Sequence, residues 1–162
     1  MHMSAIFRIS WKEKPTDSCV HFFSPHFFTK LRETGVKEVS SWTSRRRVNV
    51  FSKKFIFFPV NENEHWSFCC VVNPGLVGNV ARCADGGRRY HSDGDLEVPC
   101  LIILDPLETG GHDKPRIASW LRLWLNFEWK RVTKTTNDVF TSQSIPCYAP
   151  RGKRFYCLLY LF

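Results

Sequence analysis

The chain has 162 residues, 43% of them hydrophobic and 15% aromatic, which excludes a disordered protein and suffices for one domain with its own core. Its formal net charge of +8 favours acidic partners, and no apolar run approaches the roughly 20 residues of a membrane-spanning helix. The seven cysteines, an odd number, follow no secretory signal, which predicts a reducing intracellular compartment and mostly free thiols.

The first half of the chain is predicted to contain one helix and three strands. Residues 25–34 have the apolar spacing of a short helix, with Ser24 as a cap and Gly35 at its end. Residues 47–51 alternate in polarity, which predicts a half-buried strand. Two more strands are expected at 55–60 (FIFFPV) and 66–72 (WSFCCVV).

The second half begins with a segment rich in Gly, Asp and Arg at 73–98, which we interpret as a loop or insertion over the surface. The apolar run 100–104 (CLIIL) predicts a central strand. Apolar residues at helical spacing predict a helix over 115–129, followed by a strand near 130–134. Strands and helices in this irregular order favour an α+β fold with helices on a sheet.

Three side chains form a candidate catalytic group. His65 opens a strand after a polar turn, Asp105 ends a buried strand, and Cys157 precedes an apolar run. A thiol nucleophile needs a base to become a thiolate, and the base needs a carboxylate or amide to orient it. Because the chain has seven cysteines and six histidines, residue types alone leave many other trios open.

Several longer stretches resemble the SUMO/sentrin-specific proteases, the cysteine proteases specific for ubiquitin-like proteins. The resemblance implies a papain-like, adenain-like α+β fold with a central mixed sheet and flanking helices, incomplete at the C-terminus. Residues 1–19 would be an irregular N-terminal segment and 20–162 a partial catalytic domain. The stretches that carry it are VHFFSPHFFTKL (20–31), SWTSRRRVNVFSKKF (41–55), FIFFPVNENEHW (55–66), SFCCVVNPG (67–75), PCLIILDPL (99–107) and FEWKR (127–131).

The resemblance also implies roles for individual residues. His65 would be the general base, Asp105 would orient it, and Cys157 would attack the carbonyl after the Gly-Gly tail of SUMO or a related modifier. Trp66 would form one wall of the narrow clamp on that dipeptide. No cofactor or metal is implied, and a nuclear monomer is expected.

The surroundings of Cys157 depart from the family pattern. Arg151 stands where a Gln is expected to donate to the oxyanion, and loss of such a donor costs about a hundredfold in rate. Tyr156 and Leu158 stand where Asp and Gly are expected. The helices that follow the nucleophile are absent, so we expect a C-terminally truncated member. A catalytically inactive module that only binds the modifier therefore stays open.

Other readings of the sequence have less support. Cys147, after Gln143, is an alternative nucleophile that ranks below Cys157 because no apolar run follows it. Cys83 and His91 lie in the predicted loop, but without a CxxC spacing they do not predict a zinc site. Nucleic-acid binding rests only on charge and scattered aromatic residues, so nucleic acid is not expected among the partners.

Overall fold

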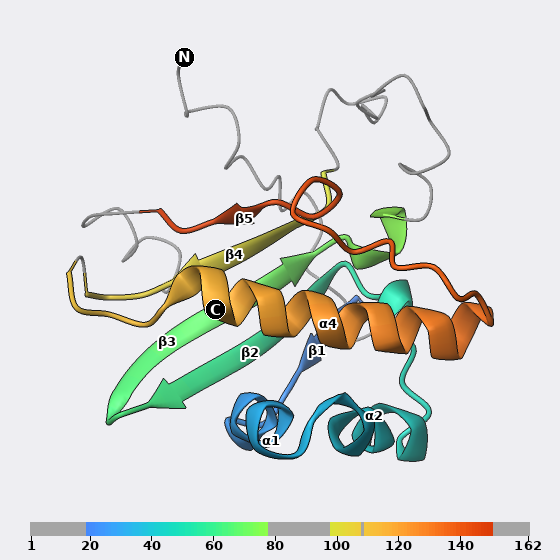
Figure 1. Cartoon of the computed structure of the whole chain (residues 1–162), viewed down its shortest axis with the longest axis horizontal. Helices are drawn as coiled ribbons and strands as arrows, with labels where there is room; N and C mark the ends of the chain where they lie inside the picture. The colour runs from blue at the N-terminus through green and yellow to red at the C-terminus, as the bar shows by residue number, and fades with distance from the viewer. Residues whose placement is uncertain (1–18, 78–97, 108, 151–162) are drawn as a thin grey trace.

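The computed structural model describes residues 19–77, 98–107 and 109–150, which form a five-stranded sheet and its helices (Figure 1). In chain order the elements are β1 (Val20–Phe22), α1 (His26–Thr34), α2 (Val36–Arg45), the 3₁₀ turn η2 (Val50–Ser52), β2 (Phe55–Glu62), β3 (His65–Val72), the 3₁₀ turn η3 (Pro74–Leu76), β4 (Cys100–Leu104), α4 (Lys114–Thr133) and β5 (Cys147–Tyr148).

The sheet is mixed, with the strand order β1-β2-β3-β4-β5. The three central strands are antiparallel, whereas β1 pairs in parallel with β2 and β5 in parallel with β4. Strands β2 and β3 form a hairpin whose two turn residues, Asn63 and Glu64, both have positive φ, at 52° and 59°. Such a turn matches the twist of the strands that it joins. The predicted α+β class with a central mixed sheet is confirmed.

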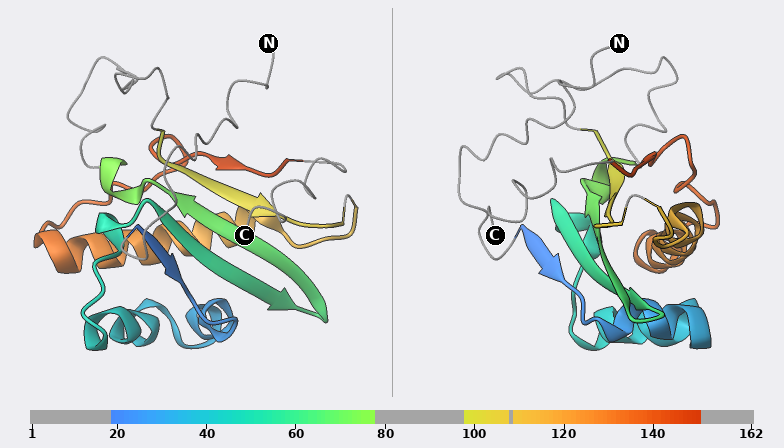
Figure 2. Two further views of the ribbon diagram at one scale, coloured as in Figure 1. Left: turned by 180° about the vertical axis from the view of Figure 1, so that it is seen from behind. Right: turned by 90° about the vertical axis from the view of Figure 1, so that its left-hand side faces the viewer.

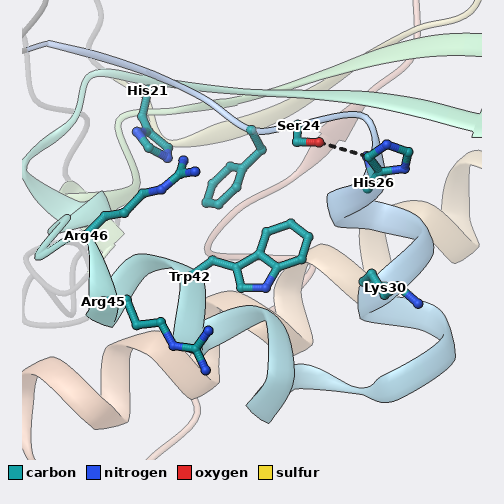
Figure 3. Close-up of a pocket in the computed structure, with 8 residues that line it drawn as sticks. His21, Ser24, His26, Lys30, Trp42, Arg45 and Arg46 are labelled. Carbon is teal, nitrogen blue, oxygen red and sulfur yellow. Dashed lines mark hydrogen bonds between the residues drawn. The ribbon is translucent and has the colours of Figure 1, made fainter.

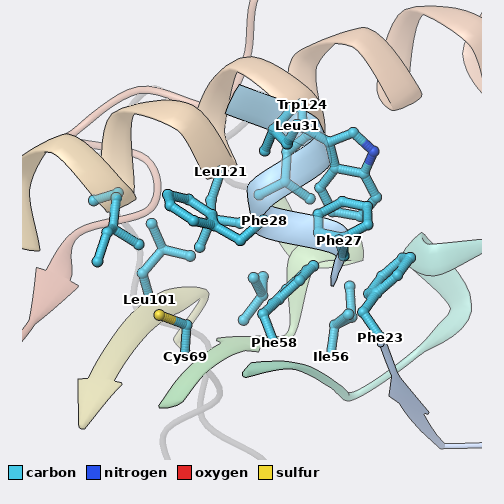
Figure 4. Packing of buried hydrophobic residues seen from close by; sticks show 14 of the residues in the cluster. Phe23, Phe27, Phe28, Leu31, Ile56, Phe58, Cys69, Leu101, Leu121 and Trp124 are labelled. Atoms are coloured by element: carbon cyan, nitrogen blue, oxygen red, sulfur yellow. The ribbon is translucent and has the colours of Figure 1, made fainter. Parts of the chain in front are cut away.

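The main core lies between one face of the sheet and the three helices, as Figures 2 and 4 show. Trp124 of α4 is fully buried and contacts the rings of Phe27 on α1 and Phe58 on β2. Burying each side chain of this size stabilises the fold by about 1.5–3 kcal/mol. The opposite face carries a smaller apolar cluster, so the adjacent Cys69 and Cys70 face opposite sides of the sheet.

Most of the predicted elements are confirmed. The first helix ends at Gly35, and the strands predicted at 55–60, 66–72 and 100–104 correspond to β2, β3 and β4. The predicted loop at 73–98 lies for the most part outside the described residues. Within the part of the chain that is described, no helix is long and apolar enough to span a bilayer.

The strand predicted at 47–51 is wrong. Arg47 has a φ of 53°, and the following residues form η2, whose turn is closed by Asn49 Oδ1 accepting from Phe51 N at 3.0 Å. Val50 is nonetheless fully buried, and Phe51 packs edge-on against Trp129. The alternation of polar and apolar residues therefore comes from apolar side chains that a turn directs into the core, and not from a pleated strand.

The strand predicted near 130–134 is also wrong, because α4 continues to Thr133 and ends at Lys134 in the left-handed region. Lys130 and Arg131 in its last turn suit the negative end of the helix dipole. Helix α2 had no predicted counterpart; its buried side includes Val39 and the small polar Thr43, which give a weak apolar pattern.

Candidate active site

The strand pairing brings His65 and Asp105 together. His65 is the first residue of β3, and Asp105 directly follows β4. Because β3 and β4 are antiparallel, with Phe68 opposite Leu104, the start of one and the end of the other lie at the same edge of the sheet. His65 Nε2 lies 2.7 Å from Asp105 Oδ1. The structure thus brings together two of the three residues of the predicted triad.

The Asp105 carboxylate is fully buried and accepts four hydrogen bonds. Burial by itself raises its pKa and is the largest single influence, but the bonds from Leu107 N, His65, His112 N and Lys114 together outweigh it and lower the pKa to about 2. The donor–acceptor distances are 3.0 Å from Leu107 N, 2.7 Å from His65 Nε2, 2.8 Å from His112 N and 3.2 Å from Lys114 Nζ. Asp105 is therefore ionised at neutral pH.

The ionised carboxylate fixes the protonation of the His65 ring. A carboxylate only accepts hydrogen bonds, so Nε2 carries the proton that is donated to Asp105. The lone pair then lies on Nδ1, the other ring nitrogen, which is available to take a proton. The His65 side chain remains 20% exposed, so a reacting group can reach it. The pair has the arrangement of a general base and its orienting acid.

A second histidine, His112, joins this pair to the hairpin. Its ring packs edge-on against His65, with centroids 4.6 Å apart. Its Nε2 donates to the backbone oxygen of Glu62 at 3.2 Å, and its Nδ1 lies 2.8 Å from Ser67 Oγ. Because Glu62 and Ser67 flank His65 in the hairpin, His112 holds both sides of the turn to the segment after Asp105.

The side chain of Glu62 connects the hairpin to two helices. It is 6% exposed and forms ion pairs with Arg32 of α1 and with Arg116 of α4, the latter at 2.7 Å. Two arginines neutralise one buried carboxylate, so burying that charge is compensated. The hairpin turn next to His65 is therefore fixed to α1 and α4.

Gly111 allows the segment after β4 to pass close to Asp105. A Cβ atom at position 111 would lie 2.3 Å from Asp105 Oδ2 and 2.7 Å from its Cγ. Only glycine leaves room for the backbone to approach the carboxylate this closely. That approach lets the neighbouring His112 N–H donate to Asp105.

Among the described residues, one group of side chains could supply the ligands of a metal ion. It consists of His65, Asp105 and His112, whose potential ligand atoms lie within 4.8 Å of one another. However, His65 Nε2 is bonded to Asp105, and both nitrogens of His112 have hydrogen-bond partners. A metal ion would have to break these bonds. The donor set fits a hydrogen-bond network better than a metal centre.

The other predicted site residues are placed as follows. Trp66 follows His65 on β3 and is 50% exposed. Cys157 lies outside the described residues.

Cys147, the alternative nucleophile, pairs with Leu101 at the far end of β4, so roughly 13 Å of strand separates it from Asp105. Burial raises the pKa of the Cys147 thiol despite the opposing charge of Arg122. The structure does not bring Cys147 to the His65–Asp105 pair.

His112, Glu62, Ser67, Lys114 and Gly111 are neighbours of the pair that the sequence reasoning missed. One signal was present: the Gly-Gly-His sequence at 110–112 lies in the short connection directly after Asp105. Paired glycines in such a connection indicate a close backbone approach, and a histidine there lies near the strand end. Glu62 and Ser67 carry no comparable signal, because their roles come from the hairpin register.

Comparison with known proteins adds family information to this geometry. The model of the Ulp1 protease family, C-terminal catalytic domain, matches residues 2–140, which include His65 and Asp105 and end before Cys157. Among curated proteins, the probable ubiquitin-like-specific proteases 2B and 2A of Arabidopsis thaliana are 32% and 31% identical, over 76% and 95% of this chain. The chain spans only 13% and 20% of their lengths.

Solved structures share the fold. A structure described as a de-sumoylating protease superposes with a TM-score of 0.58 at 18% identity, covering 86% of this chain and 46% of that one. The C-terminal Ulp1 protease domain in complex with Smt3, the yeast ortholog of SUMO, gives a TM-score of 0.52 at 18% identity, covering 84% and 49%. The family model matches most of this chain, and the fold agrees with it, so the chain belongs to the Ulp1 protease family.

Proposed function

We propose that the protein is a cysteine protease that hydrolyses the bond after the C-terminal Gly-Gly of SUMO or a related ubiquitin-like modifier. The observation that carries the proposal is the 2.7 Å bond between His65 Nε2 and the buried Asp105, within the part of the chain that the family model matches. The names of the similar proteins, ubiquitin-like-specific and sentrin-specific proteases, supply the substrate class.

In the proposed mechanism, His65 Nδ1 takes the proton of the Cys157 thiol, and Asp105 stabilises the imidazolium that forms. The thiolate attacks the carbonyl carbon of the terminal glycine. Collapse of the tetrahedral intermediate breaks the C–N bond, and the imidazolium gives its proton to the leaving amine. Water then hydrolyses the thioester with His65 again as base, so the reaction needs no cofactor.

The direction of the chain supports Cys157 as the nucleophile. Strand β5 is parallel to β4, and Asp105 follows the C-terminal end of β4. Strand β5 therefore runs towards the end of the sheet at which the His65–Asp105 pair lies. Cys147 precedes this point and is too far along the strand, which favours a later cysteine.

Trp66 is proposed to contact the Gly-Gly dipeptide. It adjoins His65 on β3, and its side chain is half exposed, although tryptophan is usually well buried. In this role the exposed indole leaves room for glycine but not for larger side chains in the bound tail. Trp66→Ala is therefore expected to weaken discrimination between Gly-Gly and Ala-Gly tails.

Covalent capture tests the proposal. Purified protein is incubated with SUMO that carries a thiol-reactive warhead in place of its last glycine, next to Cys157→Ala, His65→Ala and Cys147→Ala variants. We expect a covalent adduct in the wild type and in Cys147→Ala, and none in the other two. Capture needs only a thiolate and a bound tail, so it tests the Cys–His pair even if Arg151 leaves the oxyanion poorly stabilised.

The contrary outcomes separate the alternatives. If the folded wild type forms no adduct with SUMO or other ubiquitin-like modifiers, catalysis is refuted. Reversible binding of the same modifiers in that case would identify a non-catalytic binding module. An adduct that is lost in Cys147→Ala would move the nucleophile to Cys147 and contradict the assignment of Cys157.

The family places the protein inside the cell, and we propose the nucleus as its compartment. Imaging of a fluorescently tagged chain tests this location, and exclusion from the nucleus would refute it.

A further inference from the structure

A pocket of about 500 Å³ lies away from the His65–Asp105 pair, between β1, α1 and the end of α2 (Figure 3). None of these elements supplies His65 or Asp105. The volume is in the range of pockets that hold small ligands. The residues that line it are His21, Phe23, Ser24, His26, Lys30, Trp42, Arg45 and Arg46.

The pocket is strongly basic. Lys30, Arg45 and Arg46 carry fixed positive charges, and none of the described residues that line it is acidic. Lys30 is paired with Glu33 at 3.1 Å, whereas neither arginine takes part in an ion pair with the described residues. Figure 3 shows the Arg46 side chain beside His21, whereas Arg45 points to the other side of Trp42. A guanidinium group without a carboxylate partner favours an anion, and arginine binds phosphate through two parallel N–H donors.

The pocket also has an aromatic wall. Trp42 is half-buried and lines the pocket. Its indole packs edge-on against the buried Phe27, with ring centroids 6.0 Å apart. Phe23 lines the same space. An aromatic surface next to cations stabilises a planar ring that carries a negative group, because the ring stacks while the charge is neutralised.

We propose that this pocket binds a small anion in which a phosphate group is attached to a planar aromatic ring, as in a nucleoside phosphate or a phosphotyrosine. The phosphate lies beside Arg46, and the ring lies against Trp42. The proposal goes beyond protease activity and does not depend on it.

The protonation of His21 on anion binding provides a second signature of the site. Burial, together with the charges of Lys53 and Arg46, lowers the pKa of His21, so its ring is neutral at neutral pH. The other charged or titratable groups of the pocket are Lys30 and His26 from α1 and Arg45 from α2. A bound anion offsets these positive charges and raises the pKa of His21, so anion binding strengthens as pH falls and the ring takes up a proton.

Calorimetric titration of the full chain with phenyl phosphate, inorganic phosphate and phenol tests the proposal. We expect phenyl phosphate to bind about five- to tenfold more tightly than inorganic phosphate, and phenol to show no saturable binding. AMP and O-phosphotyrosine, titrated in parallel, distinguish the two sources of the ring. Phenyl sulfate, whose charge is constant between pH 5.5 and 7.5, is expected to bind more tightly at the lower pH, and His21→Asn reduces that difference.

Matched variants locate the site. Arg46→Gln is expected to weaken binding of phenyl phosphate about tenfold, because it removes a charged hydrogen-bond donor. Arg47→Gln removes the same charge one residue away, from an exposed side chain that does not line the pocket, and is expected to change the affinity less than twofold. Both variants are surface changes, and their unfolding midpoints are measured to show that they fold.

The proposal is overturned if phenyl phosphate binds no more tightly than inorganic phosphate, or if Arg46→Gln and Arg47→Gln weaken binding equally. The first result would remove the aromatic subsite, and the second would leave only nonspecific attraction to a basic surface. A fall in affinity in Arg46→Gln alone, with a shift of the Trp42 indole N–H resonance on binding, supports the assigned site.

Discussion

Replacing Gly111 by alanine directly tests the geometry around Asp105. The added Cβ would lie 2.3 Å from Oδ2, 2.7 Å from Cγ and 2.8 Å from Oδ1 of that carboxylate. Real Cβ atoms do not approach other atoms so closely, so either the carboxylate or the backbone at 111 must move. The carboxylate is fully buried and held by four donors, and therefore cannot move without losing some of them.

The expected cost follows from the bonds at risk. Oδ2, the closest atom, accepts from His112 N and from Lys114 Nζ. Each hydrogen bond to a charged group contributes about 1.5–3 kcal/mol, so Gly111→Ala is expected to lower the free energy of unfolding by about 3 kcal/mol. Misplacement of Asp105 also misorients His65, and a displacement near 1 Å costs about a hundredfold in rate.

Gly110→Ala is the matched control. Gly110 has a φ of 72°, and a Cβ there would meet nothing within 4 Å. The strain of alanine in the left-handed region costs about 1–2 kcal/mol, but Asp105 is left untouched. The two variants therefore separate backbone strain from a direct clash with the carboxylate.

Urea unfolding at neutral pH and the rate of capture by warhead-bearing SUMO measure the two effects. Capture is expected to fall about a hundredfold in Gly111→Ala and to change little in Gly110→Ala. Equal losses of stability and equal capture rates in both variants would refute the reasoning, since the clash would then have no consequence for Asp105.

Three further predictions concern charged and buried polar groups. Because the pKa of Asp105 is lowered from 3.8 to about 2, its ionisation stabilises the fold by about 2 kcal/mol above pH 4, and this contribution is lost as pH falls towards 2. The stability difference between wild type and Asp105→Asn, measured by urea unfolding, should therefore shrink between pH 5 and pH 2, and a constant difference would contradict the assigned pKa. Asn126 is buried and makes three hydrogen bonds to the backbone of 139–140, so Asn126→Ala should lower the free energy of unfolding by about 3 kcal/mol. The exposed Asn137 is the control, and Asn137→Ala should cost far less. Similar losses in the two variants would refute this prediction. Glu62→Gln leaves two half-exposed arginines without their shared carboxylate and should lower the free energy of unfolding in urea by about 1–2 kcal/mol. Salt at 1 M should reduce this loss of stability, because it screens the charges. A loss that does not depend on salt would show that charge is not the cause.

The confirmed elements are those whose sequence pattern depends only on burial. Strands β2 and β4 are short continuous apolar runs, and one face of α4 repeats at helical spacing through Ile117, Leu121 and Trp124. The incorrect strands at 47–51 and 130–134 show the limit of this signal. At 47–51 an alternating pattern arose from a turn, and at 130–134 a helix continued past its apolar face because charged residues in the last turn stabilise its end.

For the site, His65 and Asp105 were identified from motifs that resemble a known family, and the structure places them in contact. Their catalytic roles and that of Cys157 stay predictions until the capture experiment is done. The sequence also contains a signal for His112, because this histidine follows two glycines in the short connection after Asp105.

The sequence by itself determined the class of fold, the central strands and the family resemblance, because these follow from local runs of apolar residues and short motifs. Only the tertiary structure decided the network around the pair: His112 against His65, Gly111 beside Asp105, and Glu62 between two arginines. Such contacts join residues from different elements, and their distances depend on strand register and helix packing, which no local pattern specifies.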